Sequence, residues 1–466
     1  MSETATMGAG LPDGPLVAFY GDDFTGSAAT MEALTFAGLP SALFFAAPTA
    51  EQLARFPGLR GIGIAGIARS QTPAWMQTHL PPIYEALRET AAPILHYKIC
   101  STFDSAPHVG SIGAAIDIGQ AIFANSWVPL VTAAPAIHRY QAFGNLFATV
   151  AGRGFRLDRH PTMSRHPVTP MHEADLGLHL GKQTKRSIDV VDFVAMKTGQ
   201  ADAVMAARRA AGAEILSLDI VDQETLAEAG RLVWENREAC QFAVGSQGLE
   251  YALIAYFQKR SWIPAQAQAP MAAGVSQIVG VSGSCSPVTA EQLSWADANG
   301  FRTLPLDATL AVDERAWDAE IARAVAQALG VLSEGASPIL YTARGPDDPS
   351  AHTLRPAVEA AGVAMDLVND RIGNGLGRIL DRTLGEAGLH RGIIAGGDTS
   401  SHAALAMGVY ALTAVAATVP GAALNKAYSD DAAHRDLELA LKGGQMGTPD
   451  YFGLIRAGGR DSSSTL

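Results

Sequence analysis

Short apolar runs alternate with longer amphipathic runs from residue 16 to residue 260. The apolar runs have the length and composition of β-strands, whereas stretches such as 74–88 and 223–236 have the apolar spacing of helices. Such an alternation is typical of a largely parallel sheet with helices between successive strands. The strands expected in this half are Leu16–Tyr20, Ser41–Phe45, Gly61–Ile67, Ile94–Lys98, Val128–Thr132, Ile188–Val191, Glu214–Leu218 and Phe242–Val244.

The segment 137–172 breaks this rhythm. It is rich in His, Arg and Pro and has no clear period, so we expect a long irregular connection there. Long connections in compact domains are often functional, which makes this segment a candidate part of a binding site.

A second change comes at Trp262–Ser276, which is rich in Ala, Pro and Gln and has no charged residue. We interpret it as an interdomain linker, with an N-terminal domain at 1–262, the linker proper at 263–276 and a C-terminal domain at 277–466. Beyond it the alternation resumes, which predicts a second α/β domain with a mainly parallel sheet. The elements expected there are strands at Gln277–Val281, Pro338–Thr342 and Gly392–Ala395, and helices near Thr289–Ala298, Arg315–Ala328 and Ile372–Glu386.

Composition narrows the class of protein. The 466 residues are 48% hydrophobic and 17% charged, which fits an α/β enzyme with well-buried strands. A formal net charge of −12 speaks against a nucleic-acid or anionic-membrane surface. The longest apolar stretch, 403–419, is Ala-rich and interrupted by Gly408, so we expect a helix followed by a strand rather than a membrane span. Three scattered cysteines and the absence of a signal-peptide pattern favour the cytoplasm.

Two adjacent carboxylates follow the first expected strand, in the stretch "GDDFTG" at residues 21–26. Ligands of doubly wound sheets gather beyond the carboxyl ends of the strands. Asp22 or Asp23 is therefore a candidate to bind a substrate hydroxyl group or to accept its proton, while the other caps the helix or orients its neighbour. We expect Asp22 to lie in a solvent-accessible turn. A plain turn with an Asp N-cap is the alternative interpretation.

Two further strand ends carry polar side chains. "HYKICSTFDS" at 96–105 places Lys98 at the end of a strand and follows it with several hydroxyl groups, which together can hold a carboxylate and a polyol. "IARS" at 67–70 offers Arg69, whose guanidinium group can bind a carboxylate through two hydrogen bonds. A Ser/Thr-rich turn and an ordinary exposed arginine are the alternatives.

Three loops rich in glycine or serine follow strands in the second half. The loop 282–286 precedes a helix with Pro287 in its first turn, which offers N–H and hydroxyl groups to a phosphate. The stretch 396–400 repeats this plan, and "LKGGQMG" at 441–447 adds a third glycine-rich loop. Together they predict a site for nucleotide phosphates, although glycines also serve plain turns.

Two other glycine patterns do not fit known phosphate sites. Gly61–Gly66 has the spacing of a dinucleotide fingerprint but lies inside an expected strand, and 177–184 has the wrong glycine spacing for a P-loop. The sequence therefore lacks the fingerprint of a nicotinamide-dependent enzyme. An oxidoreductase of a small hydroxy acid is kept only as an alternative function.

In order along nearly the whole chain, these motifs resemble those of the four-carbon acid sugar kinase family. "GDDFTG" is similar to that family's Asp-Asp-x-Thr-Gly motif, and "ARS" to its strand-end Arg-Ser. "KICSTFDS" and "HPVTPM" (166–171) resemble its 3-oxo-tetronate kinase branch in particular. Four further motifs resemble those of the family's nucleotide-binding half: "GSQGL" (245–249), "SGSCSPVT", "GGDTS" and "LKGGQMG".

The resemblance implies an N-terminal acid-sugar-binding domain, a C-terminal domain that binds ATP with Mg²⁺, and phosphoryl transfer in the cleft between two α/β domains. It implies no metal-ligating residue. Of the two candidate catalytic residues, Asp22 and Asp23, the motif matches Asp22 to a substrate contact. The other implied substrate residues are Arg69, Lys98, Ile99, Cys100 and Ser101. The implied ATP residues are Ser282 or Ser284, Gly396, Gly397, Asp398, Thr399, Gly443 and Gly444.

One segment departs from the tetronate branch. Where that branch has Asn-Gly-Arg-Thr, this chain reads His138-Arg139-Tyr140. The sequence therefore leaves two alternatives for the substrate: 3-oxo-tetronate, or a related 3-oxo acid sugar such as the branched 3-oxo-isoapionate. A non-catalytic acid-sugar sensor is a further alternative, and a homodimer is one option for the assembly.

Overall fold

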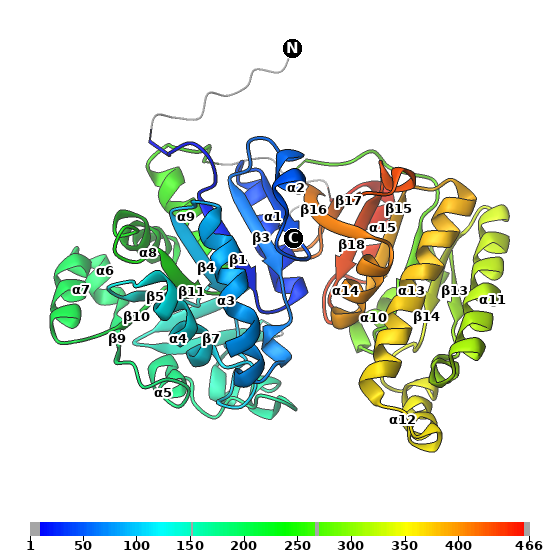
Figure 1. Cartoon of the computed structure of the whole chain (residues 1–466), viewed down its shortest axis with the longest axis horizontal. Helices are drawn as coiled ribbons and strands as arrows, with labels where there is room; N and C mark the ends of the chain where they lie inside the picture. Colours follow the sequence, from blue (N-terminus) through cyan, green and yellow to red (C-terminus); the bar gives the residue numbers. More distant parts are fainter. Residues whose placement is uncertain (1–9, 151, 266–269, 461–466) are drawn as a thin grey trace, which may run out of the picture. The chain divides into compact units, whose positions relative to one another are not determined.

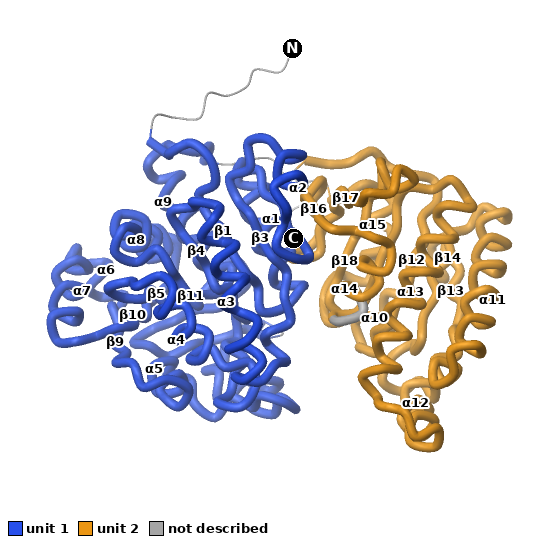
Figure 2. Tube along the Cα trace, in the orientation of Figure 1, with its two compact units in different colours: residues 1–267 blue, residues 268–466 orange. Residues whose placement is uncertain are grey.

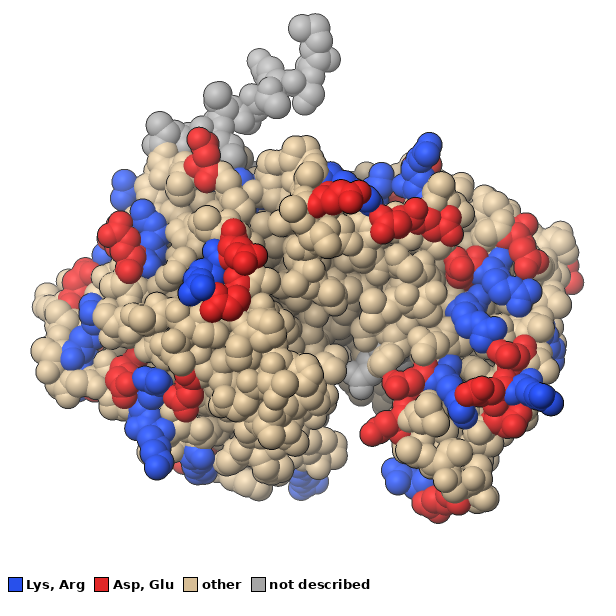
Figure 3. Space-filling view, in the orientation of Figure 1, with Lys and Arg blue, Asp and Glu red and all other residues tan. Residues whose placement is uncertain are grey.

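The computed structural model describes residues 10–150, 152–265 and 270–460. The chain divides into two compact units, residues 1–267 and 268–466 (Figure 2). Among the described residues, no helix is long and apolar enough to cross a membrane. On the face drawn in Figure 3, acidic and basic side chains are interspersed over both units.

The first unit is built on a parallel sheet in the order β2-β3-β1-β4-β11-β5-β10-β9 (Figure 1). Its central strands β1 and β4 are buried along their whole length, as expected for a sheet with helices on its faces. The apolar runs of the sequence predicted each of these strands. Their bounds are β1 Val17–Gly21, β2 Ser41–Phe44, β3 Gly61–Ala65, β4 Ile94–Lys98, β5 Val128–Val131, β9 Ile188–Val191, β10 Ile215–Leu218 and β11 Phe242–Gly245.

Helices connect successive strands of this sheet. Helix α3 packs against α4, while α9 packs against α8 and α1, which gives two groups of helices around the sheet. Side-chain caps begin many of them, such as Thr72 at α3 and Asp222 at α8. The helices are α1 Phe24–Phe36, α2 Ala50–Ala54, α3 Pro73–Glu89, α4 Ile112–Phe123, α5 Leu176–Leu180, α6 Phe193–Lys197, α7 Ala201–Ala210, α8 Gln223–Glu235 and α9 Gly248–Lys259.

The segment expected to be irregular contains a second sheet instead. Strands β6 (Arg139–Ala142), β7 (Asn145–Val150) and β8 (Arg153–Arg156) pair in antiparallel fashion. The buried carboxylate of Asp219, just beyond β10, accepts hydrogen bonds from Gln141 Nε2 and from the N–H groups of the β6–β7 turn. The expectation was wrong for residues 139–156, because tertiary hydrogen bonds hold strands that the apolar pattern does not predict.

The second unit has a sheet in the order β13-β14-β12-β15-β18-β17-β16, parallel from β13 to β18 and antiparallel beyond. Helices α11 and α13 pack against each other, and α13 also packs against α14. The strands are β12 Val279–Ser282, β13 Phe301–Pro305, β14 Ser337–Tyr341, β15 Arg391–Ala395, β16 Val409–Ala416, β17 Leu424–Ser429 and β18 Glu438–Lys442. The helices are α10 Pro287–Asp297, α11 Glu314–Ser333, α12 Ser350–Ala361, α13 Met365–Ala387, α14 Gly397–Ala406 and α15 Tyr451–Ala457.

The boundary between the two units lies between residues 267 and 268. Trp262 still belongs to the first unit, since its ring lies 5.5 Å from that of Tyr256. In the second unit, the N–H groups of Ala272 and Val275 donate to carbonyl groups at the end of α15, and Arg391 donates to Ala273. Residues 266–269 lie outside the described residues.

Candidate active site

In the first unit, the polar strand ends lie at one edge of the sheet. Strand β1 is flanked by the parallel strands β3 and β4, and Gly21 is in register with Ala65 and Lys98. Asp22 therefore follows the middle strand, Arg69 lies just beyond β3, and Lys98 ends β4. The chain crosses from one side of β1 to the other at this point, which is where open α/β sheets bind ligands.

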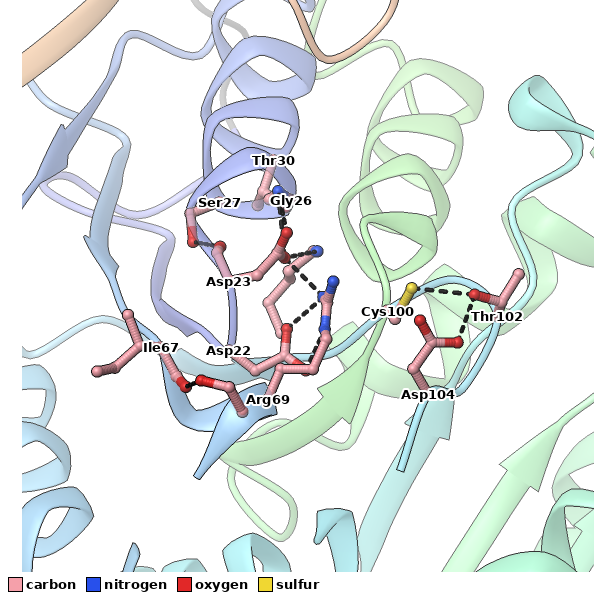
Figure 4. A network of polar contacts seen from close by, with 12 residues as sticks. Asp22, Asp23, Gly26, Ser27, Thr30, Ile67, Arg69, Cys100, Thr102 and Asp104 are labelled. Carbon is pink, nitrogen blue, oxygen red and sulfur yellow. Dashed lines mark hydrogen bonds and ion pairs between the residues drawn. The ribbon is translucent and has the colours of Figure 1, made fainter. Parts of the chain in front are cut away.

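Arg69 joins the two adjacent carboxylates (Figure 4). Its Nε donates to Asp22 Oδ2 at 3.2 Å, and its Nη2 donates to Asp22 Oδ1 and to Asp23 Oδ1, each at 2.6 Å. Lys98 Nζ also reaches Asp23 Oδ1, at 3.4 Å. Two cations and two carboxylates thus form one continuous network.

Asp23 has the capping role that the sequence left open for one of the two carboxylates. It is the N-cap of α1, and its carboxylate accepts the N–H of Gly26. A Cβ atom on Gly26 would lie 1.6 Å from Lys98 Nζ, so only glycine allows this lysine to approach the start of the helix.

Asp22 has a different environment. Its side chain is 2% exposed, against 27% for Asp23, so the expectation that Asp22 lies in a solvent-accessible turn was wrong. Burial raises the pKa of Asp22 despite the opposing attraction of Arg69 and Lys98. The pKa of Asp23 is lowered, because Arg69, Lys98 and the Gly26 N–H together outweigh its burial. Asp22 is therefore the more basic of the two carboxylates.

The segment after Lys98 turns sharply beside this network. The side chain of Ile99 is fully buried, and the Ile99 N–H donates to Gly245 O at 2.7 Å. Cys100 Sγ lies 3.0 Å from Thr102 Oγ1, which donates to Asp104 (Figure 4). Burial raises the pKa of Cys100 to about 11, so its thiol stays protonated at neutral pH. Ser101 is half-buried in the same turn.

In the second unit, three adjacent parallel strands end at a common edge. Ser282 of β12 is in register with Ala395 of β15, which is in register with Lys442 of β18. The three loops singled out in the sequence follow these strands. Ser282 and Ser284 are both buried, and the Ser284 N–H donates to Ser282 Oγ at 3.3 Å.

The loop after β18 lies against the start of α10. Ser286, the N-cap of α10, donates through its hydroxyl group to Gly444 O, and Thr289 Oγ1 donates to the same carbonyl at 3.2 Å. A Cβ atom on Gly444 would lie 2.6 Å from Ser284 Oγ. Gly443 precedes it and connects the loop to β18.

The glycines after β15 have different roles. Gly396, the N-cap of α14, has φ +132°, a conformation that side chains rarely adopt. Gly397 has an ordinary conformation, is exposed, and has open space where a Cβ would lie. Asp398 and Thr399 occupy the first turn of α14, but their side chains lie outside the described part of the structure.

Family models match the two halves of the chain separately. A sugar-binding N-terminal domain matches residues 17–253, and a nucleotide-binding C-terminal domain matches residues 279–452. The chain is 47% identical to a 3-oxo-isoapionate kinase of Paraburkholderia graminis, over 97% of this chain and 96% of the relative.

The chain belongs to the four-carbon acid sugar kinase family. It is thus an acid sugar kinase, and the oxidoreductase and sensor alternatives are set aside. A 3-oxo-tetronate kinase of Methylobacterium radiotolerans is 30% identical over 93% of this chain and 96% of the relative. The fold is that of the Haemophilus influenzae protein HI1011, with a TM-score of 0.72 at 24% identity, covering 94% of this chain and 99% of that one.

Arg139 is a candidate site residue that the sequence marked only as part of a departure from the family. It begins β6, and its Nη1 donates to the carbonyl groups of Ile137 and His138. Its Nε is buried without a hydrogen-bond partner, and Arg139 has no ion pair with any residue in the described ranges. Burial lowers the pKa of Arg139, against the attraction of Cys100 and Asp104. An unpaired guanidinium group beside the Cys100 turn is suited to bind an anion.

The nucleotide half also holds a cation that the sequence did not single out. Lys442 ends β18 and is 1% exposed. Within the ranges that the structure describes, no group of three or more His, Cys, Asp or Glu side chains is placed to hold a metal ion.

Proposed function

We propose that this protein phosphorylates a hydroxyl group of 3-oxo-isoapionate with ATP as the phosphoryl donor. The observation that carries this proposal is the 47% identity to a 3-oxo-isoapionate kinase over nearly the whole of both chains. Matches to 3-oxo-tetronate kinases reach 30% identity in the comparisons above. The departure at His138-Arg139-Tyr140 supports the same choice, because it replaces the segment typical of the tetronate branch.

The residues of the first unit have distinct roles in this proposal. Asp22 accepts the proton of the attacking hydroxyl group, since burial makes it the more basic carboxylate. Arg69 holds Asp22 and Asp23 in place, and with Lys98 it supplies positive charge at the strand ends. Arg139, whose guanidinium group has no ion pair among the described residues, binds the carboxylate of the acid sugar in this proposal.

The second unit binds ATP in this proposal. The buried hydroxyl groups of Ser282 and Ser284 and the start of helix α14 after β15 fit the needs of phosphate oxygens. Mg²⁺ bound with ATP would neutralise charge on the phosphates. Phosphoryl transfer depends mainly on positioning and electrostatic stabilisation, so the chain needs no covalent nucleophile. This agrees with a Cys100 thiol that stays protonated.

A panel assay tests this function. ADP formation is coupled to a colour change and measured with 3-oxo-isoapionate, 3-oxo-tetronate, and the matching aldonates that lack the 3-oxo group. We expect the highest kcat/KM for 3-oxo-isoapionate. A higher kcat/KM for 3-oxo-tetronate would leave the kinase activity standing but contradict the proposed substrate.

A further inference from the structure

Lys442 is a buried cation at the edge where the nucleotide loops converge. Its side chain is 1% exposed. Lys442 is the last residue of β18, and the glycine pair Gly443-Gly444 follows it directly. The Gly396 N–H donates to the backbone carbonyl of Lys442 at 2.9 Å, which ties this strand end to the start of α14.

Only neutral groups bind the ammonium group of Lys442 within the described residues. Its Nζ donates to Thr289 Oγ1 and to Gly443 O, each at 3.2 Å. Thr289 lies in the first turn of α10, where its hydroxyl also contacts Ser284 Oγ at 3.0 Å. No carboxylate forms an ion pair with Lys442 in the part of the chain that the structure describes.

Such a lysine is costly to keep charged. Buried charges are normally paired. A buried ammonium group without an ion pair avoids the free-energy cost of desolvation by releasing its proton, which lowers its pKa. Burial lowers the pKa of Lys442 to about 8, and no charged group contributes to this shift. The surrounding segments, at the start of α10 and in the loop after β12, offer the hydroxyl groups of Ser284, Ser286 and Thr289.

We infer that Lys442 binds the phosphate groups of the nucleotide directly, as the cation of the second unit's binding site. The inference rests on the proposed use of ATP. It follows from four observations together: the strand-end position, the burial, the neutral partners and the convergence of three loops. A phosphate is the anion that would make this buried charge favourable.

The inference has a measurable consequence in proton uptake. At pH 8 about half of the Lys442 side chains are neutral in the free protein, since their pKa is about 8. A phosphate contact favours the charged form, so nucleotide binding should take up about half a proton per molecule at pH 8, and less at pH 7.

Calorimetric titration of the full-length protein with ATP and Mg²⁺, in buffers of different ionisation enthalpy, measures this uptake. The wild-type protein, Lys442→Met and Lys426→Met are compared. Lys426 is the other lysine of the second unit and lies on β17, so Lys426→Met is the matched control. We expect Lys442→Met to lose the uptake and to bind ATP about 10- to 100-fold more weakly, with the control unchanged.

The melting temperature separates binding from a structural role. Methionine removes an unpaired buried charge, so Lys442→Met should melt at the wild-type temperature or above it. Unchanged ATP affinity and proton uptake in Lys442→Met would overturn the inference while leaving the proposed function intact. A wild-type protein that binds no ATP would overturn the proposed function and the inference with it.

Discussion

Asp22 and Asp23 are adjacent in the chain but have different surroundings. Asp22 is almost fully buried against Arg69, whereas Asp23 caps a helix. Asp22→Asn should lower kcat by about 10²–10⁴-fold, the usual range for loss of a general base. Asp23→Asn should cost little stability and lower kcat much less, because asparagine caps a helix about as well as aspartate does. Activity is measured per folded molecule, with melting curves on the same preparations. A greater loss of kcat in Asp23→Asn would make Asp23 the base.

The raised pKa of Asp22 predicts a pH dependence. As the pH falls through that pKa, Asp22 becomes protonated and can no longer accept the hydroxyl proton, so kcat falls. The midpoint of this fall in kcat, the acid limb of the profile, should lie at a higher pH than the pKa of an ordinary aspartate, about 3.9. A kcat–pH profile of the wild type and of Asp22→Asn checks this, because the variant should lack the limb. An identical limb in both would assign it to another group.

Arg139 gives a prediction about the acid sugar alone. Arg139→Met should raise KM for the sugar by about 10- to 100-fold, since a charged hydrogen bond is lost, and leave KM for ATP unchanged. The control is Arg153→Met, because Arg153 is exposed on the same small sheet and lies over the Phe155 ring. Equal effects on both substrates would point to a structural role for Arg139.

At the scale of elements, a buried pair joins β4 to α9. His96 Nδ1 lies 2.7 Å from Glu250 Oε1, Nε2 lies 2.9 Å from Gly245 O, and both side chains are fully buried. His96→Leu or Glu250→Leu should each cost about 3–5 kcal/mol of stability, because one polar partner stays buried alone. The double variant should cost less than the sum. Urea unfolding measures this, and Glu51→Ala in the exposed pair with Arg55 should cost less than about 1 kcal/mol. If the double variant lost as much stability as the two single variants combined, the coupling between His96 and Glu250 would be refuted.

The elements found from the sequence share one property. β1, β3 and β4 are largely apolar runs with polar residues at or soon after their ends, so both the strands and the candidate residues beside them could be predicted. β6 and β8 contain arginines and no apolar run, and cross-strand pairing and Asp219 hold that sheet. The roles proposed for Arg139 and Lys442 rest on burial and on the lack of acidic partners among the described residues, which are properties of the tertiary structure.

At the scale of the whole molecule, we expect bound substrates to protect the link between the two units, because phosphoryl transfer that excludes water commonly involves closure of loops or domains. The link is expected within residues 263–276, a stretch without charged residues. Elastase should cut the free protein there first, and ATP with the acid sugar should slow the cut. Mass spectrometry of the fragments locates the site. First cleavage inside 279–298 would contradict this division, since β12 and α10 lie there.

The central claim is phosphoryl transfer from ATP to 3-oxo-isoapionate, and ³¹P NMR of the complete reaction tests it most directly. We expect the ATP γ-phosphate signal to be replaced by signals of ADP and of a phosphomonoester of the sugar, in equal amounts. We expect no such product without the acid sugar, and product formation about 10²–10⁴-fold slower with Asp22→Asn. ATP converted only to ADP and inorganic phosphate, or left unchanged, would contradict the account.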